Sequence, residues 1–244
     1  MKKSILLVLL YLLIQTLAEG IFALLISQWW EGNMETAMVV ALLAADIIMA
    51  GILIQKGYVS DSRLTHPTTV SFIGWTLVAG ISAIFISDFI ASITDFLPNW
   101  LESTFSNIEG SWLGILAIAI IGPILEEMLF RGAVTSELLK SYNPQKAILF
   151  SALIFGIFHI NPAQVLNAFL LGLLLAWLFY KTHSLIPGIL IHILNNSLSI
   201  YFTRTYPEAD TLADIMGSAP YYICLALAVL LVVASIWQLD KKKG

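Results

Sequence analysis

Eight long apolar runs, separated by short connections rich in charged residues, Gly, Pro or Asn, follow one another along the chain. A helix of about 20 apolar residues is long enough to cross the roughly 30 Å hydrocarbon core of a bilayer. The pattern therefore predicts an all-α fold, a polytopic membrane bundle of about eight transmembrane helices. The expected spans lie near residues 4–28, 35–56, 69–93, 111–139, 146–160, 163–181, 184–203 and 219–238.

Two of these runs depart from a regular span. The fourth carries Gly122 and Pro123, and a proline there removes one backbone hydrogen bond, loosens the helix and frees carbonyl groups. We expect this to admit water beside the acids that follow. The fifth has only about fifteen residues before Asn161, so it is predicted either to be buried in the bundle or not to cross fully.

The composition is that of a membrane protein. Of the 244 residues 59% are hydrophobic and 11% are charged, whereas roughly a quarter of a soluble domain is charged. The mean hydropathy is +0.87. The net charge of -4 comes without a basic patch, so the sequence predicts a lipid bilayer and no nucleic acid as partner. Nothing in the pattern specifies an oligomeric state.

Basic residues at both ends of the chain predict its orientation. Lys2 and Lys3 lie at the start and Lys241–Lys243 near the end, and an even number of spans places both termini on one side. Because basic segments stay on the cytoplasmic side, we expect both termini to be cytoplasmic. The first run lacks a small-residue cleavage site and is predicted to be a retained span. The minimal loops favour a bacterial inner membrane.

Three polar motifs interrupt the apolar runs. Ionisable groups at membrane depth cost several kcal/mol, so they usually face the bundle interior and have a function there. An acid, two imidazoles and an amide are the groups that a hydrolytic site needs to activate water and to hold an oxyanion. The motifs are Glu126-Glu127-x-x-x-Arg131, Phe155-x-x-x-His159 and His192-x-x-x-Asn196.

The spacing within the first motif predicts different roles for its two acids. Neighbouring residues on a helix point about 100° apart, so Glu126 and Glu127 are not expected to face one pocket. Glu127 and Arg131 are spaced i, i+4, which suits an ion pair. Glu126 is then the free carboxylate that carries the chemistry, and the ion pair supports it.

The other two motifs have the same helical spacing. Phe155 lies one turn before His159, so its ring is predicted to restrict the imidazole and to exclude lipid. His192 and Asn196 place two donors on one face, which suits an oxyanion. Measured from the basic side, Glu126, His159 and Asn196 all lie roughly 18–21 Å deep and His192 roughly 12 Å deep, so the motifs are expected to meet.

Other polar residues in the spans leave alternatives open. Each motif residue taken singly also fits a proton relay, a helix–helix hydrogen bond or a neutral core group. Glu19, Asp46 and Asp88 are further acids in or near spans, and Glu19 and Asp46 are expected to pair or to stay protonated. The single cysteine, Cys224, excludes a disulfide framework.

The three motifs, in this order across about seventy residues, resemble the CPBP family of CAAX proteases and bacteriocin-processing enzymes, also called Abi proteins. All three match without a substitution. The resemblance covers residues 111–203, which we take as a catalytic core. Residues 1–110 form three N-terminal spans, and residues 204–244 form a loop and the last span.

The resemblance implies an intramembrane endopeptidase that acts on a membrane-associated peptide or protein. Glu126 and His159 would activate the attacking water, and His192 and Asn196 would stabilise the oxyanion. No cofactor is firmly predicted. A glutamate mechanism stands beside a zinc mechanism in which Glu126, His159 and His192 are the ligands and water is the fourth.

Two other functions stay open. One is a noncatalytic family member that acts in bacteriocin immunity or membrane sequestration, against which the intact motifs count. The other is a proton-coupled transporter that uses Glu19, Asp46 and Glu126, which the lack of recognisable inverted repeats weakens.

Overall fold

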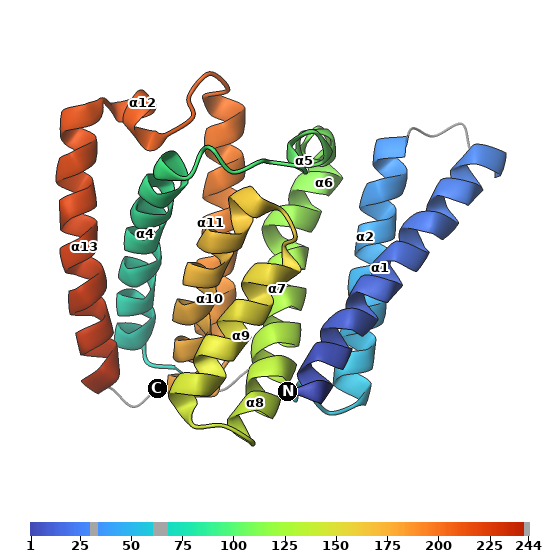
Figure 1. Cartoon of the computed structure of the whole chain (residues 1–244), viewed down its shortest axis with the longest axis horizontal. Coiled ribbons are helices and arrows are strands. Elements are labelled where there is room, and N and C mark those ends of the chain that lie inside the picture. Colours follow the sequence, from blue (N-terminus) through green and yellow to red (C-terminus); the bar gives the residue numbers. More distant parts are fainter. Residues whose placement is uncertain (30–33, 61–67, 242–244) are drawn as a thin grey trace.

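All regular secondary structure in the described part of the chain is helical (Figure 1). A computed structural model describes residues 1–29, 34–60 and 68–241. The predicted all-α membrane bundle is confirmed. The long helices are α1 (Lys2–Trp29), α2 (Met34–Gln55), α4 (Val70–Ile93), α9 (Pro144–Phe158), α10 (Pro162–Thr182), α11 (Ile186–Thr205) and α13 (Ser218–Lys241).

The fourth apolar run is one continuous helix that alternates between α-helical and π-helical hydrogen bonding. Its pieces are α6 (Trp112–Leu116), the π-helix η1 (Ala117–Ile121), α7 (Gly122–Glu127), the π-helix η2 (Met128–Thr135) and α8 (Ser136–Leu139).

Two short helices lie outside the eight runs and were not predicted. They are α5 (Glu102–Glu109) and α12 (Leu212–Met216).

The eight predicted runs are all helical, with ends within a few residues of those expected. By length and composition, six helices in the described ranges are long and apolar enough to cross a membrane. The other two are α9, which has only 15 residues, and α11, which has 20. Polar side chains such as His192 and Asn196 lower the mean hydropathy of α11. The residues that suggest a site therefore also make this helix less apolar than the other long helices.

The helices form three groups in Figure 1. The α1–α2 hairpin stands on one side and the α4–α13 pair on the other, with the fourth run, α9, α10 and α11 between them. The first turn of α1 and the last turn of α13 lie at the same end of the bundle. This agrees with an even number of spans; that this end is cytoplasmic stays a prediction. Lys242 and Lys243 lie outside the described residues.

The loosening that Pro123 predicted in the fourth helix takes the form of π-helical turns. In η1 the N–H of Gly122 bonds to the carbonyl of Ala117, five residues back. The same register would pair the Ile118 carbonyl with the nitrogen of Pro123, which has no hydrogen. The Ile118 carbonyl is therefore released from the helix, as the proline led us to expect. Such π-turns are frequent at functional sites.

The main buried cluster joins the N-terminal hairpin to the central helices. It contains Tyr11, Leu53, Leu129, Phe130 and Phe155, all at most 2% exposed. Large apolar side chains on the outside of α1 and α13 are instead well exposed, as expected for helices that face lipid; examples are Leu6, Leu230 and Val233.

Candidate active site

Glu127 and Arg131 of the fourth run form a buried ion pair. Nη1 of Arg131 donates a hydrogen bond of 2.8 Å to Oε1 of Glu127, and both side chains are at most 1% exposed. The guanidinium carbon also lies 4.3 Å from the ring centroid of Phe155, a cation–π contact. The ion pair predicted from the i, i+4 spacing is present, and each partner compensates the buried charge of the other.

His192 connects this ion pair to the second acid. Its Nδ1 lies 3.0 Å from Oε1 of Glu127, and its Nε2 lies 3.7 Å from Oε2 of Glu126. The expectation that the two neighbouring acids do not face one site is therefore wrong. Their side chains leave the helix in different directions, but the imidazole from α11 reaches between them and contacts each with a different nitrogen.

His159 lies at the end of α9, where its ring is fixed by Phe155. Nδ1 of His159 is 2.9 Å from the Phe155 carbonyl oxygen. A carbonyl can only accept, so Nδ1 carries the hydrogen and Nε2 of the neutral ring has the lone pair. The Phe155 ring meets the rings of His159 and His192 edge-on, with centroids 4.8 and 5.7 Å apart. The predicted Phe155–His159 contact is present, and the phenyl ring contacts both imidazoles.

A turn that the sequence analysis missed fixes the backbone beside His159. Ile160 has a φ of 59°, which is strained for a β-branched residue. The buried side chain of Asn161 donates to Oδ1 of Asn99 at 2.7 Å and accepts from the N–H of Trp100 at 3.0 Å. The turn is thus attached to the loop before α5. An Asn before a helix-starting Pro usually suggests a cap, but this side chain makes no capping bond.

We expect Asn161→Ala to destabilise the protein by about 1–3 kcal/mol, because it removes both bonds and leaves the Trp100 N–H unpaired. The matched control is Ile160→Gly at the neighbouring position. It should be tolerated, because glycine adopts positive φ without strain. Thermal unfolding of both variants in the same detergent checks this. An Asn161→Ala protein that melts like wild type would contradict the expectation.

Asn196 contacts the carbonyl that the proline releases. Its Nδ2 donates to the Ile118 carbonyl at 3.1 Å, and its Oδ1 accepts from Nδ2 of Asn195 at 3.1 Å. Asn196 therefore makes one of the helix–helix hydrogen bonds that the structural alternative predicted. An amide nitrogen has two donors, so this bond leaves one N–H for the oxyanion role, which stays a prediction.

The backbone of α11 approaches Glu127 closely at Gly188. A Cβ added to Gly188 would lie 2.6 Å from Oε2 of Glu127. Any side chain at this position must displace the carboxylate that holds both Arg131 and His192. Gly188 is a supporting residue that none of the three motifs includes.

Gly188→Ala is accordingly expected to destabilise the protein by about 1–3 kcal/mol and to disturb the Glu127–His192 contact. Gly74→Ala on α4 is the control, because a Cβ there meets nothing within 4 Å, and alanine favours a helix by up to about 1 kcal/mol over glycine. The two melting temperatures in one detergent should move in opposite directions. Equal shifts of the two melting temperatures would show that the structure accommodates a methyl group at position 188 without the predicted clash.

Glu19 and Asp46 do not pair with each other, which was one of the two expectations for them; that they stay protonated remains a prediction. Asp46 accepts a hydrogen bond of 2.5 Å from the Tyr11 hydroxyl, and Glu19 is exposed. The expected Glu19–Asp46 pair is absent because the antiparallel hairpin places Tyr11, two turns before Glu19, opposite Asp46. Asp88 accepts from the N–H of Leu212 at 3.0 Å and from the Tyr221 hydroxyl at 2.7 Å, and so links α4 to α12 and α13.

The alternative zinc mechanism needs Glu126, His159 and His192 in one cluster. In the part of the chain that the structure describes, no three His, Cys, Asp or Glu side chains gather so that they could hold a metal ion. The nitrogens of His192 face two carboxylates, and Nδ1 of His159 faces a carbonyl. Metal-ligating histidines also donate their other ring N–H to a carbonyl or a carboxylate, so these contacts alone do not decide against zinc, and the metal requirement stays a prediction.

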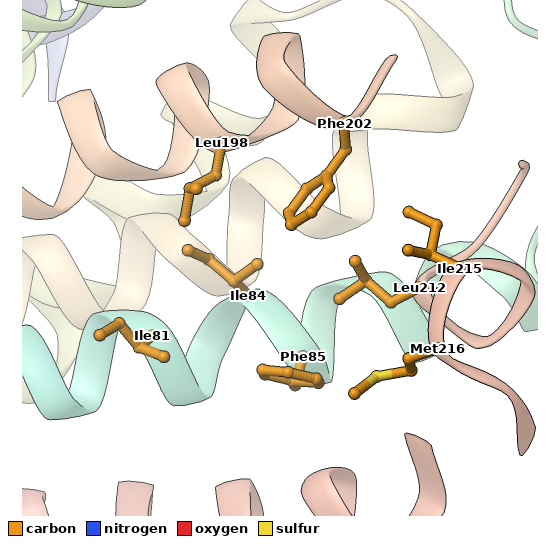
Figure 2. Close-up of a pocket in the computed structure, with 8 residues that line it drawn as sticks. All are labelled: Ile81, Ile84, Phe85, Leu198, Phe202, Leu212, Ile215 and Met216. Atoms are coloured by element: carbon orange, nitrogen blue, oxygen red, sulfur yellow. The ribbon is translucent and has the colours of Figure 1, made fainter. Parts of the chain in front are cut away.

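A hydrophobic pocket of about 190 Å³ lies apart from these residues, between α4, α11 and α12 (Figure 2). Its lining is wholly apolar and includes Phe85 from α4, Phe202 from α11 and Met216 from α12. A reaction site needs a few convergent polar groups beside its apolar wall. The pocket is therefore not the candidate site, although Phe202 follows Asn196 on the same helix.

Comparisons with known proteins match the segment that carries the three motifs. Residues 108–198, which contain all three motifs, match the family model described as "Type II CAAX prenyl endopeptidase Rce1-like". The chain is 30% identical over 115 residues to "Membrane-embedded CAAX protease MroQ" of Staphylococcus aureus (strain USA300), covering 45% of this chain and 47% of that protein. It is 27% identical over 153 residues to "Putative membrane peptidase YdiL" of Bacillus subtilis (strain 168), covering 57% of this chain and 63% of that protein.

These matches agree with the resemblance of the three motifs to the CPBP family. The chain spans about half to two thirds of the length of these curated relatives. No solved structure matches it. The family model covers the chain from the end of α5 into α11, and it leaves out α1, α2, α4 and α13.

Proposed function

We propose that this protein is an intramembrane endopeptidase that hydrolyses a peptide bond of a membrane-associated peptide or protein. The observation that carries the proposal is the placement of His192 between Glu126 and Glu127, beside the Phe155 ring that also contacts His159. Similarity to a membrane-embedded CAAX protease supports the reaction class.

The proposed reaction needs a base, an oriented water and an oxyanion donor. The carboxylate of Glu126 and Nε2 of His159 are the two acceptors for a proton of the attacking water. As the water oxygen bonds to the scissile carbonyl carbon, the carbonyl becomes an oxyanion, which Nδ2–H of Asn196 would stabilise, joined by Nε2–H of His192 when both nitrogens of that ring carry a hydrogen. The C–N bond then breaks, and the proton taken from water goes to the leaving amine.

The supporting residues form one connected series. Arg131 holds Glu127, and Glu127 holds Nδ1 of His192. A carboxylate on one nitrogen of an imidazole fixes its orientation and directs the other nitrogen to its task, here towards Glu126. The buried ion pair of Arg131 and Glu127 thus orients His192. It does not orient Glu126 or His159 directly.

The environment of the site sets conditions on the substrate. The protein is an integral membrane protein, and we propose that it lies in a bacterial inner membrane with both termini cytoplasmic. A helical substrate hides its carbonyls in hydrogen bonds, so cleavage requires a locally unwound segment, which we place near a membrane boundary.

Neither alternative function is favoured. The proposed transporter used Glu19, Asp46 and Glu126, but Glu19 is exposed and Asp46 is bonded to Tyr11. The hydrogen bond of Asn196 to the Ile118 carbonyl is a structural contact that a noncatalytic protein would also make, but it leaves one N–H of Asn196 for an oxyanion.

The test is cleavage of a library of membrane-tethered peptides by the protein reconstituted in liposomes, with new termini read by mass spectrometry. We expect defined cleavage that persists when a chelator is added. Loss of cleavage with chelator and its return with zinc would replace the glutamate mechanism by a metal mechanism. Loss of cleavage by His159→Ala with the fold intact is also expected. No cleavage of any peptide by the wild-type protein would count against a peptidase.

A further inference from the structure

The turn between α9 and α10 has a backbone conformation that its central side chain does not hold in place. Ile160 has a φ of 59°, and this residue is 59% exposed. A β-branched residue is strained at such a φ, and the strain persists only where the surrounding structure maintains it. Asn161, the next residue, is fully buried. We therefore look to the contacts of Asn161 for what holds the turn.

Asn161 joins this turn to α10 by its backbone and to a distant loop by its side chain. Its carbonyl accepts two N–H groups from the first turn of α10. Its side chain donates to Oδ1 of Asn99 at 2.7 Å and accepts from the N–H of Trp100 at 3.0 Å. Asn99 and Trp100 belong to the loop from α4 to α5, which runs over the end of the bundle away from the termini (Figure 1). The loop thus holds the turn through Asn161.

The backbone of this turn decides which group the Phe155 carbonyl accepts from. The N–H of His159 bonds to the carbonyl of Gly156, three residues back, at 3.2 Å. The N–H of Ile160 bonds in the same way to the carbonyl of Ile157 at 3.0 Å. An α-helical turn would instead pair the N–H of His159 with the Phe155 carbonyl. The tighter turn leaves that carbonyl to Nδ1 of His159, 2.9 Å away. The position of the ring hydrogen therefore depends on the backbone beside it.

We propose that Asn161 is a positioning residue that fixes the ring of His159 through the turn between α9 and α10. Without its side-chain bonds, Ile160 relaxes to negative φ, and the N–H of His159 takes the Phe155 carbonyl. Nδ1 then loses its acceptor, and Nε2 is no longer held as a proton acceptor for the attacking water. The loop before α5 is thus part of the working site, although it precedes the matched residues. The kinetic effect rests on the proposed function, whereas the position of the ring hydrogen does not.

The kinetic test separates kcat from KM for a cleaved peptide. Asn161→Ala is expected to lower kcat by on the order of 10- to 100-fold with KM nearly unchanged, because a misplaced base impairs the reacting step. Asn99→Ala removes one of the two bonds at an exposed position, and should lower kcat less. Asn99→Asp keeps an oxygen acceptor for Asn161 and should retain the wild-type rate. Wild-type kcat in folded Asn161→Ala, or equal losses in the two Asn99 variants, would overturn the proposal.

The opposite end of α9 provides the matched control. The side chain of Asn143 accepts from the N–H of Lys146 at 3.0 Å and caps the start of the helix. Asn143→Ala therefore removes an asparagine bond from the same helix but does not touch the turn at its other end. It should lower the melting temperature and leave kcat unchanged. An equal loss of kcat in Asn143→Ala and Asn161→Ala would show a general effect of a weakened helix and would overturn the proposal.

Nitrogen NMR of protein labelled with ¹⁵N-histidine tests the ring without activity. With a chelator present and the ring neutral, the His159 signals are assigned by their loss in His159→Ala. We expect the hydrogen on Nδ1 in the wild type and in Asn143→Ala, and a mixture of both neutral forms in Asn161→Ala. Asn99→Ala gives the same readout if Asn161→Ala does not fold.

The two tests fail separately. If the wild type cleaves nothing, the proposed function fails and the ring signals alone decide the inference. If cleavage is intact and the ring signals of the Asn161→Ala or Asn99→Ala protein match those of the wild type, the inference fails and the proposed function stands.

Discussion

Glu126→Gln is expected to reduce cleavage of a confirmed substrate by about 10²- to 10⁴-fold, the usual contribution of a general base. The amide has nearly the same shape as the carboxyl group but cannot accept a proton from water. Because Glu126 makes no buried salt bridge with arginine, its replacement should leave the Glu127–Arg131 pair closed and the fold intact. Initial rates at saturating substrate measure the effect.

A matched control distinguishes chemistry from a general loss of charge in a span. Glu19→Gln makes the same change at an exposed position on α1, and its rate should equal that of the wild type. Circular dichroism and thermal unfolding of both variants check that they are folded. Substantial cleavage by folded Glu126→Gln would remove this residue from the chemistry.

Glu127→Gln is expected to have the largest effect on stability, about 3–5 kcal/mol, because it leaves the buried Arg131 guanidinium without its counter-ion. The change also replaces the carboxylate that Nδ1 of His192 contacts by a neutral amide. Reversible unfolding in a denaturing detergent measures the loss. The double variant Glu127→Gln/Arg131→Met should recover part of it, because no unpaired charge is then buried.

The same run of the chain supplies an exposed ion pair for comparison. Lys140 pairs with Glu137, and the Lys140 side chain is largely exposed. Lys140→Ala should cost only about 0–1 kcal/mol, since water compensates the charge that is left. Similar losses for Glu127→Gln and Lys140→Ala would mean that the buried pair is not the support that we describe.

The helices were predictable because the membrane requires long apolar runs, and the structure places all eight within a few residues of the expected ends. Local spacing also predicted the contacts that stay within one helix, as for Glu127 with Arg131 and Phe155 with His159. Composition and length alone do not show which helices pack together, so these successes concern elements and local pairs.

The errors arise where a side chain from another helix intervenes. Helical geometry correctly separates Glu126 from Glu127, yet His192 enters from α11 and contacts both. The 100° rule describes one helix and contains no information on its neighbour. In the same way, pairing with Glu19 was one of the two expectations for Asp46, but the register of the hairpin, which depends on packing, gives Asp46 the hydroxyl of Tyr11 instead.

Backbone features were predictable only in part. Pro123 signalled a released carbonyl, and the structure shows Asn196 bonded to Ile118. The strained Ile160 and the bonds of Asn161 to the loop before α5 had no comparable signal. Their partners lie about sixty residues away in the chain, and only the tertiary structure brings them together.

The most direct test of the central claim is cleavage of one tethered peptide in ¹⁸O-labelled water by wild-type protein and by Glu126→Gln. The account predicts a single ¹⁸O atom in the new carboxyl terminus with the wild type, because the activated water becomes part of the product, and almost no product with the variant. Labelled product formed at the wild-type rate by folded Glu126→Gln would contradict the account.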